Sequence, residues 1–350
     1  MRTFKKIGIV SLILVVLVSS VSALLIEPMI KNEGVYCCDA HLRETLAGTI
    51  DFVYIGDSDG MTGFCPELFD NSTGYTSYNL SGTMMTMHSR YYLLEKEIRR
   101  NPIGTVVVQL SPEALLRKNT NYGDGDSATL MRLDSFSERI GFMLRYVAVD
   151  DWLNIYSRHL VDSISYWKNV LTGSIDGSQV NYSARGWKKI SAVDVSLSPE
   201  EASSKYNISS FEADFFEDSV DELKDVIALC KENNVRVILV SQPFSDAWIW
   251  ETDDWDYYGN WLKNFSEEND CEFLDFNLLK DRYALFSDEK SFKDTVHMSE
   301  DGAKAFTMAL AETLNKMSVG EEIDTLFYDS YAEMKLDSPY AASLHVGAED

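Results

Sequence analysis

Five short apolar segments, separated by turns and helical stretches, constrain the fold of this chain most. Each has strand length, is rich in β-branched or aromatic residues and ends at turn-forming residues. They are residues 51–56 (DFVYIG), 76–80 (TSYNL), 104–110 (GTVVVQL), 235–241 (VRVILVS) and 271–276 (CEFLDF), and helical patterns follow at residues 84–100, 218–233 and 299–316. Because parallel strands need crossover connections, the alternation predicts an α/β fold, a five-stranded parallel sheet in a flavodoxin-like three-layer α/β/α arrangement.

Two regions fall outside this alternation. Residues 113–212, after the third predicted strand, are too long for one crossover and contain helical patterns interrupted by the polar stretches NTNYGDGDS and TGSIDGSQ. They predict a mostly helical insertion that acts as a lid or faces a partner, not an independent domain. Residues 320–350 are acidic and without clear periodicity, so we expect a peripheral C-terminal extension.

The N-terminus predicts contact with a membrane. The run Ile7–Ile26 carries no charge, and its length of about 20 residues is enough for a helix to cross a bilayer. Bases at positions 2, 5 and 6 precede the run, which places everything after Ile30 on the extracytoplasmic side. Val21-Ser22-Ala23 also resembles the cleavage site of a signal peptide, but the length of the run favours a retained single-pass anchor in residues 1–30. Residues 31–350 then form the α/β domain in the cell envelope.

Charge and cysteine content exclude some classes of partner. The net charge of −25, from 56 acidic and 31 basic residues, disfavours binding to nucleic acid and to anionic lipid surfaces. The five cysteines are irregularly spaced and lack the paired pattern of zinc sites, so no metal or cofactor is expected. Cys230 and Cys271 border apolar segments and are expected to be buried thiols, whereas Cys37 or Cys38 could form a disulfide with Cys65.

Ser58 lies just beyond the first predicted strand, in the turn IGDSDG. Ligands of open parallel sheets bind at the carboxyl ends of the strands, and a serine nucleophile needs a base and a group that orients the base. Of the five histidines, His297 has the most suitable context, because Asp294 precedes it by three residues in the loop before the final predicted helix. A metal site that also uses Asp57 and Asp59 is the weaker alternative, since one histidine with scattered acids is a poor ligand set.

These two blocks resemble the GDSL/SGNH hydrolase superfamily. IGDSDG is similar to the Gly-Asp-Ser block that follows the first strand in that superfamily, and DTVHMSEDGA is similar to its Asp-x-x-His block before the last helix. The resemblance covers about residues 51–100 and 235–316. It implies an SGNH-type serine hydrolase or acyltransferase in which Ser58 attacks an acyl carbon, His297 acts as base and then acid, and Asp294 orients His297.

The resemblance also implies an oxyanion hole. YNLSG, which ends at Gly82, is similar to the second block of the family, so the amides of Ser58 and Gly82 are the implied donors. The family usually has an asparagine after the third strand, where this chain offers Gln109 and Ser111, and Asp59 stands where leucine is usual. These departures leave open the alternative that the chain keeps the fold of the superfamily but has lost catalytic activity.

The anchor, the topology and the core together are similar to envelope members of the superfamily, including the D-alanyl transfer proteins of teichoic acids and the alginate acetylation proteins. This resemblance implies acylated cell-surface polysaccharide, or another ester, as substrate and an integral-membrane O-acyltransferase as partner. The alternative is an inactive relative that binds the polymer or that partner.

An aromatic run, residues 247–261, follows the fourth predicted strand and approaches the same edge of the sheet. Trp248, Trp250 and Trp255 alternate with acidic residues, a composition that suits stacking on sugar rings. Packing of this aromatic loop against the insertion is an equally good interpretation.

Overall fold

The computed structural model describes residues 17, 20–26, 28–29, 46–116, 123–133, 135–174, 185–193, 195, 217–251, 254–339 and 341. The chain divides into two compact units. The helical unit comprises Met1–Thr45 and Asp126–Val180, and the sheet unit comprises Leu46–Gly125 and Asn181–Asp350. The units are described separately below.

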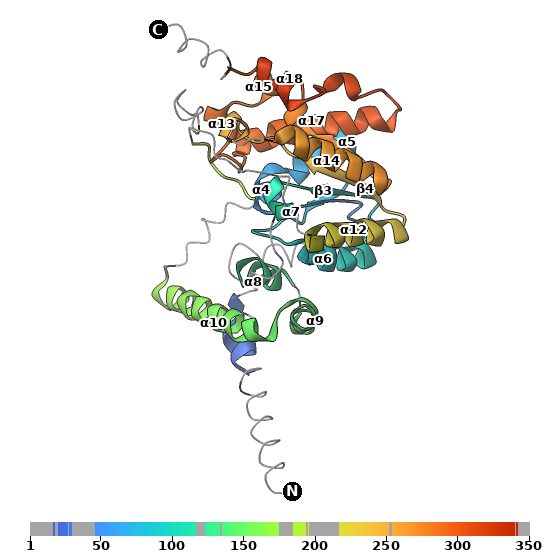
Figure 1. The fold of residues 1–350 in the computed structure, drawn as a ribbon. Helices are drawn as coiled ribbons and strands as arrows, with labels where there is room; N and C mark the ends of the chain where they lie inside the picture. Colours follow the sequence, from blue (N-terminus) through green and yellow to red (C-terminus); the bar gives the residue numbers. More distant parts are fainter. Residues whose placement is uncertain are drawn as a thin grey trace, which may run out of the picture. The chain divides into compact units, whose positions relative to one another are not determined.

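The sheet unit is built on five parallel strands (Figure 1). They are β1 (Phe52–Ile55), β2 (Ser77–Asn79), β3 (Thr105–Gln109), β4 (Arg236–Ser241) and β5 (Glu272–Asp275). The strand order is β2-β1-β3-β4-β5, and every neighbouring pair is parallel. The five strands predicted from the sequence are confirmed, as is the three-layer α/β/α fold class.

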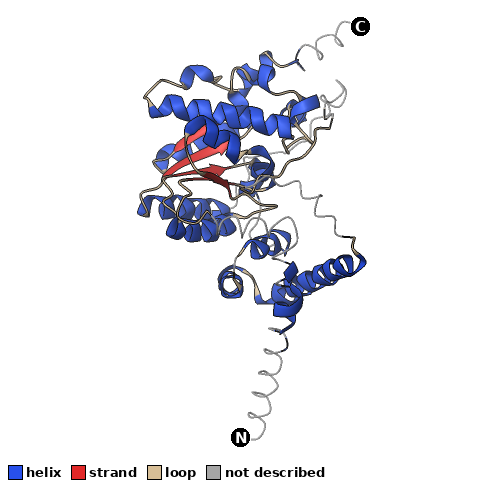
Figure 2. Cartoon of the chain, turned by 180° about the vertical axis from the view of Figure 1, so that it is seen from behind, coloured by secondary structure: helices blue, strands red, loops and turns tan. Residues whose placement is uncertain are grey.

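Helices cover both faces of the sheet (Figures 1 and 2). Phe52 and Tyr54 of β1 pack in one apolar cluster with Phe306 of α17, whereas α6 and α12 pack together on the opposite face. The α-helices of this unit are α4 (Ser58–Gly63), α5 (Pro66–Thr73), α6 (Met87–Arg100), α7 (Pro112–Leu116), α12 (Glu217–Glu232), α13 (Asp246–Glu251), α14 (Trp255–Glu268), α15 (Arg282–Leu285), α16 (Asp288–Ser291), α17 (Glu300–Ser318) and α18 (Tyr331–Leu336). The three helices predicted from the sequence correspond to α6, α12 and α17.

The helical unit contains η1 (Ser22–Ile26), α9 (Phe136–Tyr146) and α10 (Val149–Thr172). α8 (Gly123–Arg132) begins in the sheet unit and ends in the helical unit. Ile26 and Met29 are buried against Tyr166 of α10, and the Trp167 indole donates a hydrogen bond to the Leu25 carbonyl oxygen over 3.2 Å. The end of the apolar N-terminal run therefore packs on α10.

The structure describes much of the predicted insertion but only part of the predicted anchor. A helical insertion between β3 and β4 is present, but the helical unit takes only Asp126–Val180 of it, and both α7 and Arg185–Val193 belong to the sheet unit. Within the described ranges, no helix is both long and apolar enough to span a membrane. Most of Ile7–Ile26 lies outside those ranges, so the anchor stays a prediction.

The C-terminal extension is more firmly packed than its sequence indicates. It contains η3 (Asp324–Leu326) and α18, and the buried Tyr331 donates a hydrogen bond from its hydroxyl to Asp275 Oδ2 over 2.7 Å. Burial raises the pKa of Asp275 to about 6, although hydrogen bonds from Tyr331 and Asn277 act in the opposite direction. Up to Ser338, the extension therefore contributes buried residues to the unit.

The predicted disulfide is wrong for Cys65, which is a buried free thiol. Its place in the apolar cluster with Phe64 and Phe69 explains why it is not on the outer surface. Cys230 is buried and Cys271 is partly buried, and both are free, as expected for thiols that border strands. Cys37 and Cys38 lie outside the described residues.

Candidate active site

The turn after β1 places Ser58 at the start of α4. β1 is buried along its whole length, and the chain leaves it through Gly56 and Asp57. Asp57 is the N-cap of α4, where its Oδ1 accepts a hydrogen bond from the Asp59 amide over 3.1 Å. A carboxylate at this position satisfies an amide of the first helical turn and fixes where the helix begins. Asp57 therefore stabilises the turn that carries Ser58.

His297 links Ser58 to Asp294 through its two ring nitrogens. Nε2 of His297 lies 2.9 Å from Ser58 Oγ, and Nδ1 lies 2.9 Å from both carboxylate oxygens of Asp294. The structure thus brings together the three side chains that the sequence predicts as catalytic, from positions up to 239 residues apart.

The electrostatics of Asp294 determine the tautomer of His297. Burial by itself would raise the pKa of Asp294, but hydrogen bonds from the His297 ring and amide and from the Val296 amide lower the pKa to about 2. Asp294 is therefore ionised near neutral pH and can only accept hydrogen bonds. Nδ1 of neutral His297 carries the proton, and the lone pair of Nε2 faces Ser58.

A short loop closed at both ends presents Asp294 and His297 on the same side. Phe292 and Met298 form an antiparallel bridge, and the Lys293 amide donates to the His297 carbonyl oxygen over 2.8 Å. Ser299 then caps α17 by accepting a hydrogen bond from the Gly302 amide. We call residues 292–299 the histidine loop.

Buried polar side chains hold the turn after β1 and the helix α4 in place. Asn79 Nδ2 donates to the carbonyl oxygens of Gly60 (2.9 Å) and Phe64 (3.0 Å), so it ties β2 to α4. Gln109 Oε1 accepts the Asp57 amide over 3.2 Å, and Ser111 Oγ donates to Asp57 Oδ2 over 3.1 Å. Gln109 and Ser111 therefore hold the turn in place. They lie at and just beyond the end of β3, where the superfamily resemblance implies an asparagine that donates to the oxyanion.

Arg90 of α6 is a further member of this support that the sequence did not indicate. Its side chain is fully buried, its Nη1 donates to the Gln109 carbonyl oxygen, and its Nη2 lies 3.9 Å from Asp57 Oδ2. Arg90 thus lies against both Gln109, which supports the turn, and Asp57, the N-cap of α4.

The predicted role of Gly82 as an oxyanion donor is not met in this structure. The Gly82 amide donates to the Gly56 carbonyl oxygen over 3.2 Å, and the Leu80 amide donates to the Tyr54 carbonyl oxygen in the same way. These bonds continue the β1–β2 ladder beyond the end of β2. Because the Gly82 N–H is already engaged, only the Ser58 amide is left of the two predicted donors.

Residues 185–193, here called the strap, contact β2 and α4 beside the candidate site. The Asn79 amide donates to the Arg185 carbonyl oxygen over 3.0 Å, the Lys188 amide donates to Met61 O over 2.9 Å, and the Trp187 indole donates to Thr62 O over 2.9 Å. Trp187 is buried in the same apolar cluster as Phe64. The strap is thereby fastened to both β2 and α4.

The strap also bonds to the segment that carries His297. The Val193 amide donates to the Phe292 carbonyl oxygen over 2.9 Å, and the Glu300 amide donates to the Ile190 carbonyl oxygen over 2.8 Å. Gly186 makes the entry possible: its φ is +86°, and a Cβ there would lie 2.0 Å from the Asn79 carbonyl oxygen. One segment therefore connects the helix that begins with Ser58 to the histidine loop.

Asp59 lies beside the contact between Ser58 and His297. Its Oδ1 is 3.7 Å from His297 Nε2, the same nitrogen that faces Ser58, and its side chain is buried. A carboxylate in this position opposes a negative charge on a nearby oxyanion.

The tryptophans predicted for sugar binding serve mainly in packing. Trp255 is 2% exposed and packs on Tyr331, Trp248 and Phe244, so its predicted role in substrate binding is wrong. Trp248 is partly buried, and the indole of Trp250 donates to Ser338 Oγ over 3.1 Å. This aromatic run packs against the C-terminal extension, whereas the two alternatives drawn from the sequence were stacking on sugar rings and packing against the insertion.

Two further histidines lie in structural positions. His88 is buried between α6 and α12 with Nδ1 3.5 Å from Glu222. His159 is buried in the helical unit, 2.8 Å from Ser127 Oγ, and burial lowers its pKa. Among the residues that the structure describes, no group of histidine, cysteine and acidic side chains has the arrangement of a metal site.

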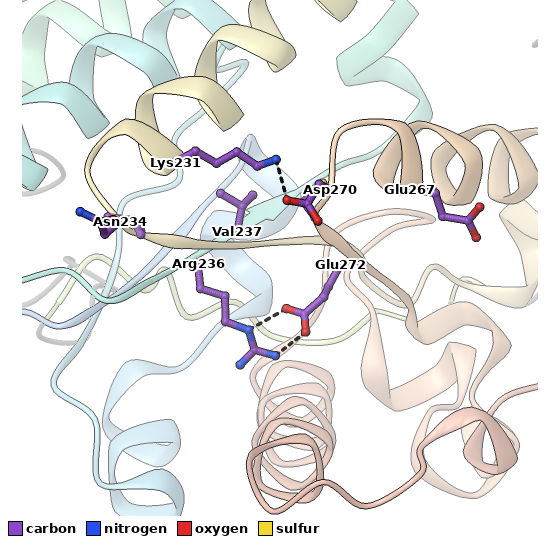
Figure 3. A pocket seen from close by; sticks show the side chains of 9 residues that line it. Lys231, Asn234, Arg236, Val237, Glu267, Asp270 and Glu272 are labelled. Atoms are coloured by element: carbon purple, nitrogen blue, oxygen red, sulfur yellow. Dashed lines mark hydrogen bonds and ion pairs between the residues drawn. The ribbon is translucent and has the colours of Figure 1, made fainter.

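A pocket of about 790 Å³ lies at the opposite end of the strands, where β4 and β5 begin (Figure 3). Its charged side chains pair with one another: Arg236 forms two hydrogen bonds with Glu272, of 2.6 and 2.7 Å, and Lys231 lies 3.3 Å from Asp270. Since the candidate catalytic groups follow the carboxyl ends of β1 and β5, this pocket is not part of their site.

Comparison with solved structures finds distant likenesses. A GDSL-like lipase from Bacteroides thetaiotaomicron is 11% identical, with a TM-score of 0.37, over 80% of this chain and 98% of that chain. A catalytic mutant of an acetylxylan esterase from Geobacillus stearothermophilus is 12% identical, with a TM-score of 0.32, over 79% and 96%. A protein from Bacteroides fragilis, described as a proposed acylhydrolase, is 12% identical, with a TM-score of 0.38, over 79% and 94%.

No protein-family model and no curated protein matches the chain. One of these solved structures is described as a GDSL-like lipase, and GDSL is also the name of the superfamily that the two sequence blocks resemble. At such identities and TM-scores, the case for a function rests on the geometry of Ser58, His297 and Asp294 in this chain.

Proposed function

We propose that this chain is a serine esterase or O-acyltransferase of the SGNH type. The observation that carries the proposal is the hydrogen-bonded series from Ser58 Oγ through His297 to Asp294, with both contacts at 2.9 Å. A serine oxygen, an imidazole in the matching tautomer and an ionised carboxylate in this order are the components of nucleophilic acyl transfer.

The geometry supports the following steps. Ser58 Oγ attacks the carbonyl carbon of an ester while its proton moves to His297 Nε2, which gives a tetrahedral oxyanion and an imidazolium paired with Asp294. His297 then returns the proton to the leaving alkoxide oxygen as the carbon–oxygen bond breaks, leaving acyl-Ser58 and a free alcohol. Water or a sugar hydroxyl then attacks the acyl carbon and passes its proton to His297. The bond between the acyl carbon and Ser58 Oγ breaks, His297 returns the proton to Oγ, and the carboxylic acid or the new ester is released.

The location and substrate within the proposal come from the sequence. The apolar run Ile7–Ile26 with bases on one side supports a single-pass membrane protein whose sheet unit is extracytoplasmic. Acyl groups of cell-envelope polysaccharide are then the proposed substrate, and an integral-membrane O-acyltransferase is the proposed partner. Hydrolysis and transfer share the acyl-enzyme, so the acceptor alone distinguishes them.

The test is hydrolysis of p-nitrophenyl acetate by the full-length protein and its variants. We expect Ser58→Ala and His297→Ala to lower kcat by about a thousandfold or more. The control is Ser72→Ala, since Ser72 Oγ bonds only within α5 and to Met308 Sδ. Equal rates in the wild type and Ser58→Ala would refute the proposal.

One observation favours a second candidate, a non-catalytic protein that binds envelope polymer or the acyltransferase. The Gly82 amide is engaged by Gly56, and Gln109 and Ser111 support the turn, so the oxyanion would have few donors. Losing one donor lowers kcat by roughly a hundredfold to a thousandfold in other enzymes. Binding of acetylated polysaccharide by a protein without esterase activity, unchanged in His297→Ala, would favour this second candidate.

A further inference from the structure

α10 carries a row of exposed aliphatic side chains along one side. The five residues are between 57% and 83% exposed: Val149, Leu153, Val161, Ile164 and Leu171. At about 100° per residue they fall within roughly a third of the helix circumference, over nearly the full length of the helix. Single exposed aliphatic side chains are ordinary, but five within one third of the circumference, interrupted by Asp150, Ser157 and Lys168, indicate a surface that meets something apolar.

This row is not the side of α10 that holds the helical unit together. The buried residues of the helix are Ile155, His159, Ser163 and Tyr166, which recur every three or four positions and mark a different side. α10 thus uses one side for packing within the unit and leaves the aliphatic row, called the apolar stripe below, exposed to the surroundings.

The apolar N-terminal run ends on α10. Ile26 and Met29 are buried against Tyr166, and Trp167 Nε1 donates to the Leu25 carbonyl oxygen over 3.2 Å. A run that crosses a bilayer must leave the lipid near its last apolar residues. The contact with Leu25 and Ile26 therefore places α10 at the depth where the chain would emerge from the membrane.

We propose that the apolar stripe of α10 lies in the interfacial region of the same lipid bilayer into which the N-terminal run inserts. Tyr156 and Trp167 are partly buried at the border between the apolar stripe and the packed side. Tryptophan and tyrosine prefer this depth, where a ring meets acyl chains and its polar atom meets water. The bilayer thus covers the apolar stripe and orients the helical unit.

The charges of α10 select the kind of lipid surface. The helix carries three aspartates, at positions 150, 151 and 162, against Arg158 and Lys168. Anionic headgroups attract basic helices and repel acidic ones, so a zwitterionic surface fits this helix better. This inference depends on the N-terminal run and is independent of the chemistry of Ser58.

The experiment places an environment-sensitive fluorescent amino acid at single positions of the full-length chain in phosphatidylcholine vesicles. The test positions are Leu153 and Ile164, and the matched controls are their exposed neighbours Asn154 and Ser165, about 100° away around the helix. Lipids brominated along the acyl chain quench fluorophores that reach the hydrocarbon. We expect at least twofold stronger quenching at Leu153 and Ile164 than at the controls.

Three outcomes would overturn the inference. The first is equal quenching at all four positions. The second is quenching at the test positions only after an integral-membrane protein is added, which would show that the apolar stripe binds protein. The third is failure of the full-length chain to float with the vesicles. Circular dichroism of each variant ensures that a lost signal does not reflect an unfolded α10.

Discussion

The indole of Trp187 donates a hydrogen bond to the carbonyl oxygen of Thr62 over 2.9 Å and so fastens the strap to the helix that begins with Ser58. The same strap bonds to Phe292 and Glu300 on either side of His297. The strap contains none of the three side chains of the candidate site, yet it joins the two segments that carry Ser58 and His297.

Trp187→Phe should lower kcat about tenfold and leave KM nearly unchanged, because small displacements of a nucleophile from its base are costly. Steady-state kinetics on p-nitrophenyl acetate measure both constants. Trp152→Phe is the matched control, since Trp152 makes a similar hydrogen bond to the Val147 carbonyl oxygen over 3.1 Å but lies in the helical unit. Equal loss of kcat in both variants would show that the strap has no special role.

Asp59→Asn should increase kcat on a neutral ester by about threefold to tenfold. The substitution removes a negative charge from a buried carboxylate 3.7 Å from His297 Nε2, and that charge opposes the oxyanion. Glu67→Gln, at an exposed position in the first turn of α5, is the control for loss of one charge. An unchanged or reduced kcat in Asp59→Asn would contradict this assignment.

Asp294→Asn should lower kcat by about a hundredfold to ten-thousandfold with the fold intact, because an amide can place the wrong tautomer of His297 before Ser58. The pKa of Asp294 is about 2, below its ordinary value of 3.8, so the carboxylate stabilises the fold above about pH 4 and loses this effect as the pH falls towards 2. Chemical unfolding of both proteins should give free energies that converge between pH 4 and 2. Full activity of Asp294→Asn would contradict the proposed role.

Asp275 should have the opposite effect on stability. Burial raises its pKa from 3.8 to about 6, so the folded state holds a proton that the unfolded state has lost, and the free energy of unfolding falls as the pH rises from about 4 to 6. This rise in the pKa of Asp275 corresponds to a loss of about 3 kcal/mol in the free energy of unfolding over that range. Asp275→Asn should flatten the stability profile over this range, as measured by urea unfolding, and an unchanged slope would exclude this cause.

Much of the sheet unit could be predicted from the sequence because its strands are buried on both faces. The residues TVVVQ of β3 form an almost continuous apolar run between Gly104 and the turn at Ser111, and such runs need no contact information to be recognised. Ser58 and His297 were found for a related reason. Each lies next to an element boundary that the pattern already predicts, so the topology brings both to one edge of the sheet.

Other features depend on contacts that no local pattern encodes. The strap has no regular periodicity, and only the pair Gly186-Trp187 hints at a close backbone approach. Arg90 has the charge of a surface residue yet is fully buried beneath Asp57. Trp255 illustrates the converse, because an aromatic side chain suits a sugar site and a core equally well until its neighbours are known.

The donors of the oxyanion hole also could not be predicted from the motif. The motif locates Gly82 correctly after β2, but the direction of its N–H depends on how far the pairing of β1 and β2 continues. In this chain the pairing extends to Gly56 and occupies the amide.

The most direct test of the central claim is the mass of the intact protein after reaction with a fluorophosphonate. The full-length wild type should gain the mass of one phosphonyl group, and peptide mapping should place that group on Ser58, because His297 lies 2.9 Å from its hydroxyl and can remove the proton. Ser58→Ala should gain nothing, and Ser72→Ala should react like the wild type. An unmodified wild type, or equal modification of Ser58→Ala, would contradict the assignment of Ser58 as the nucleophile.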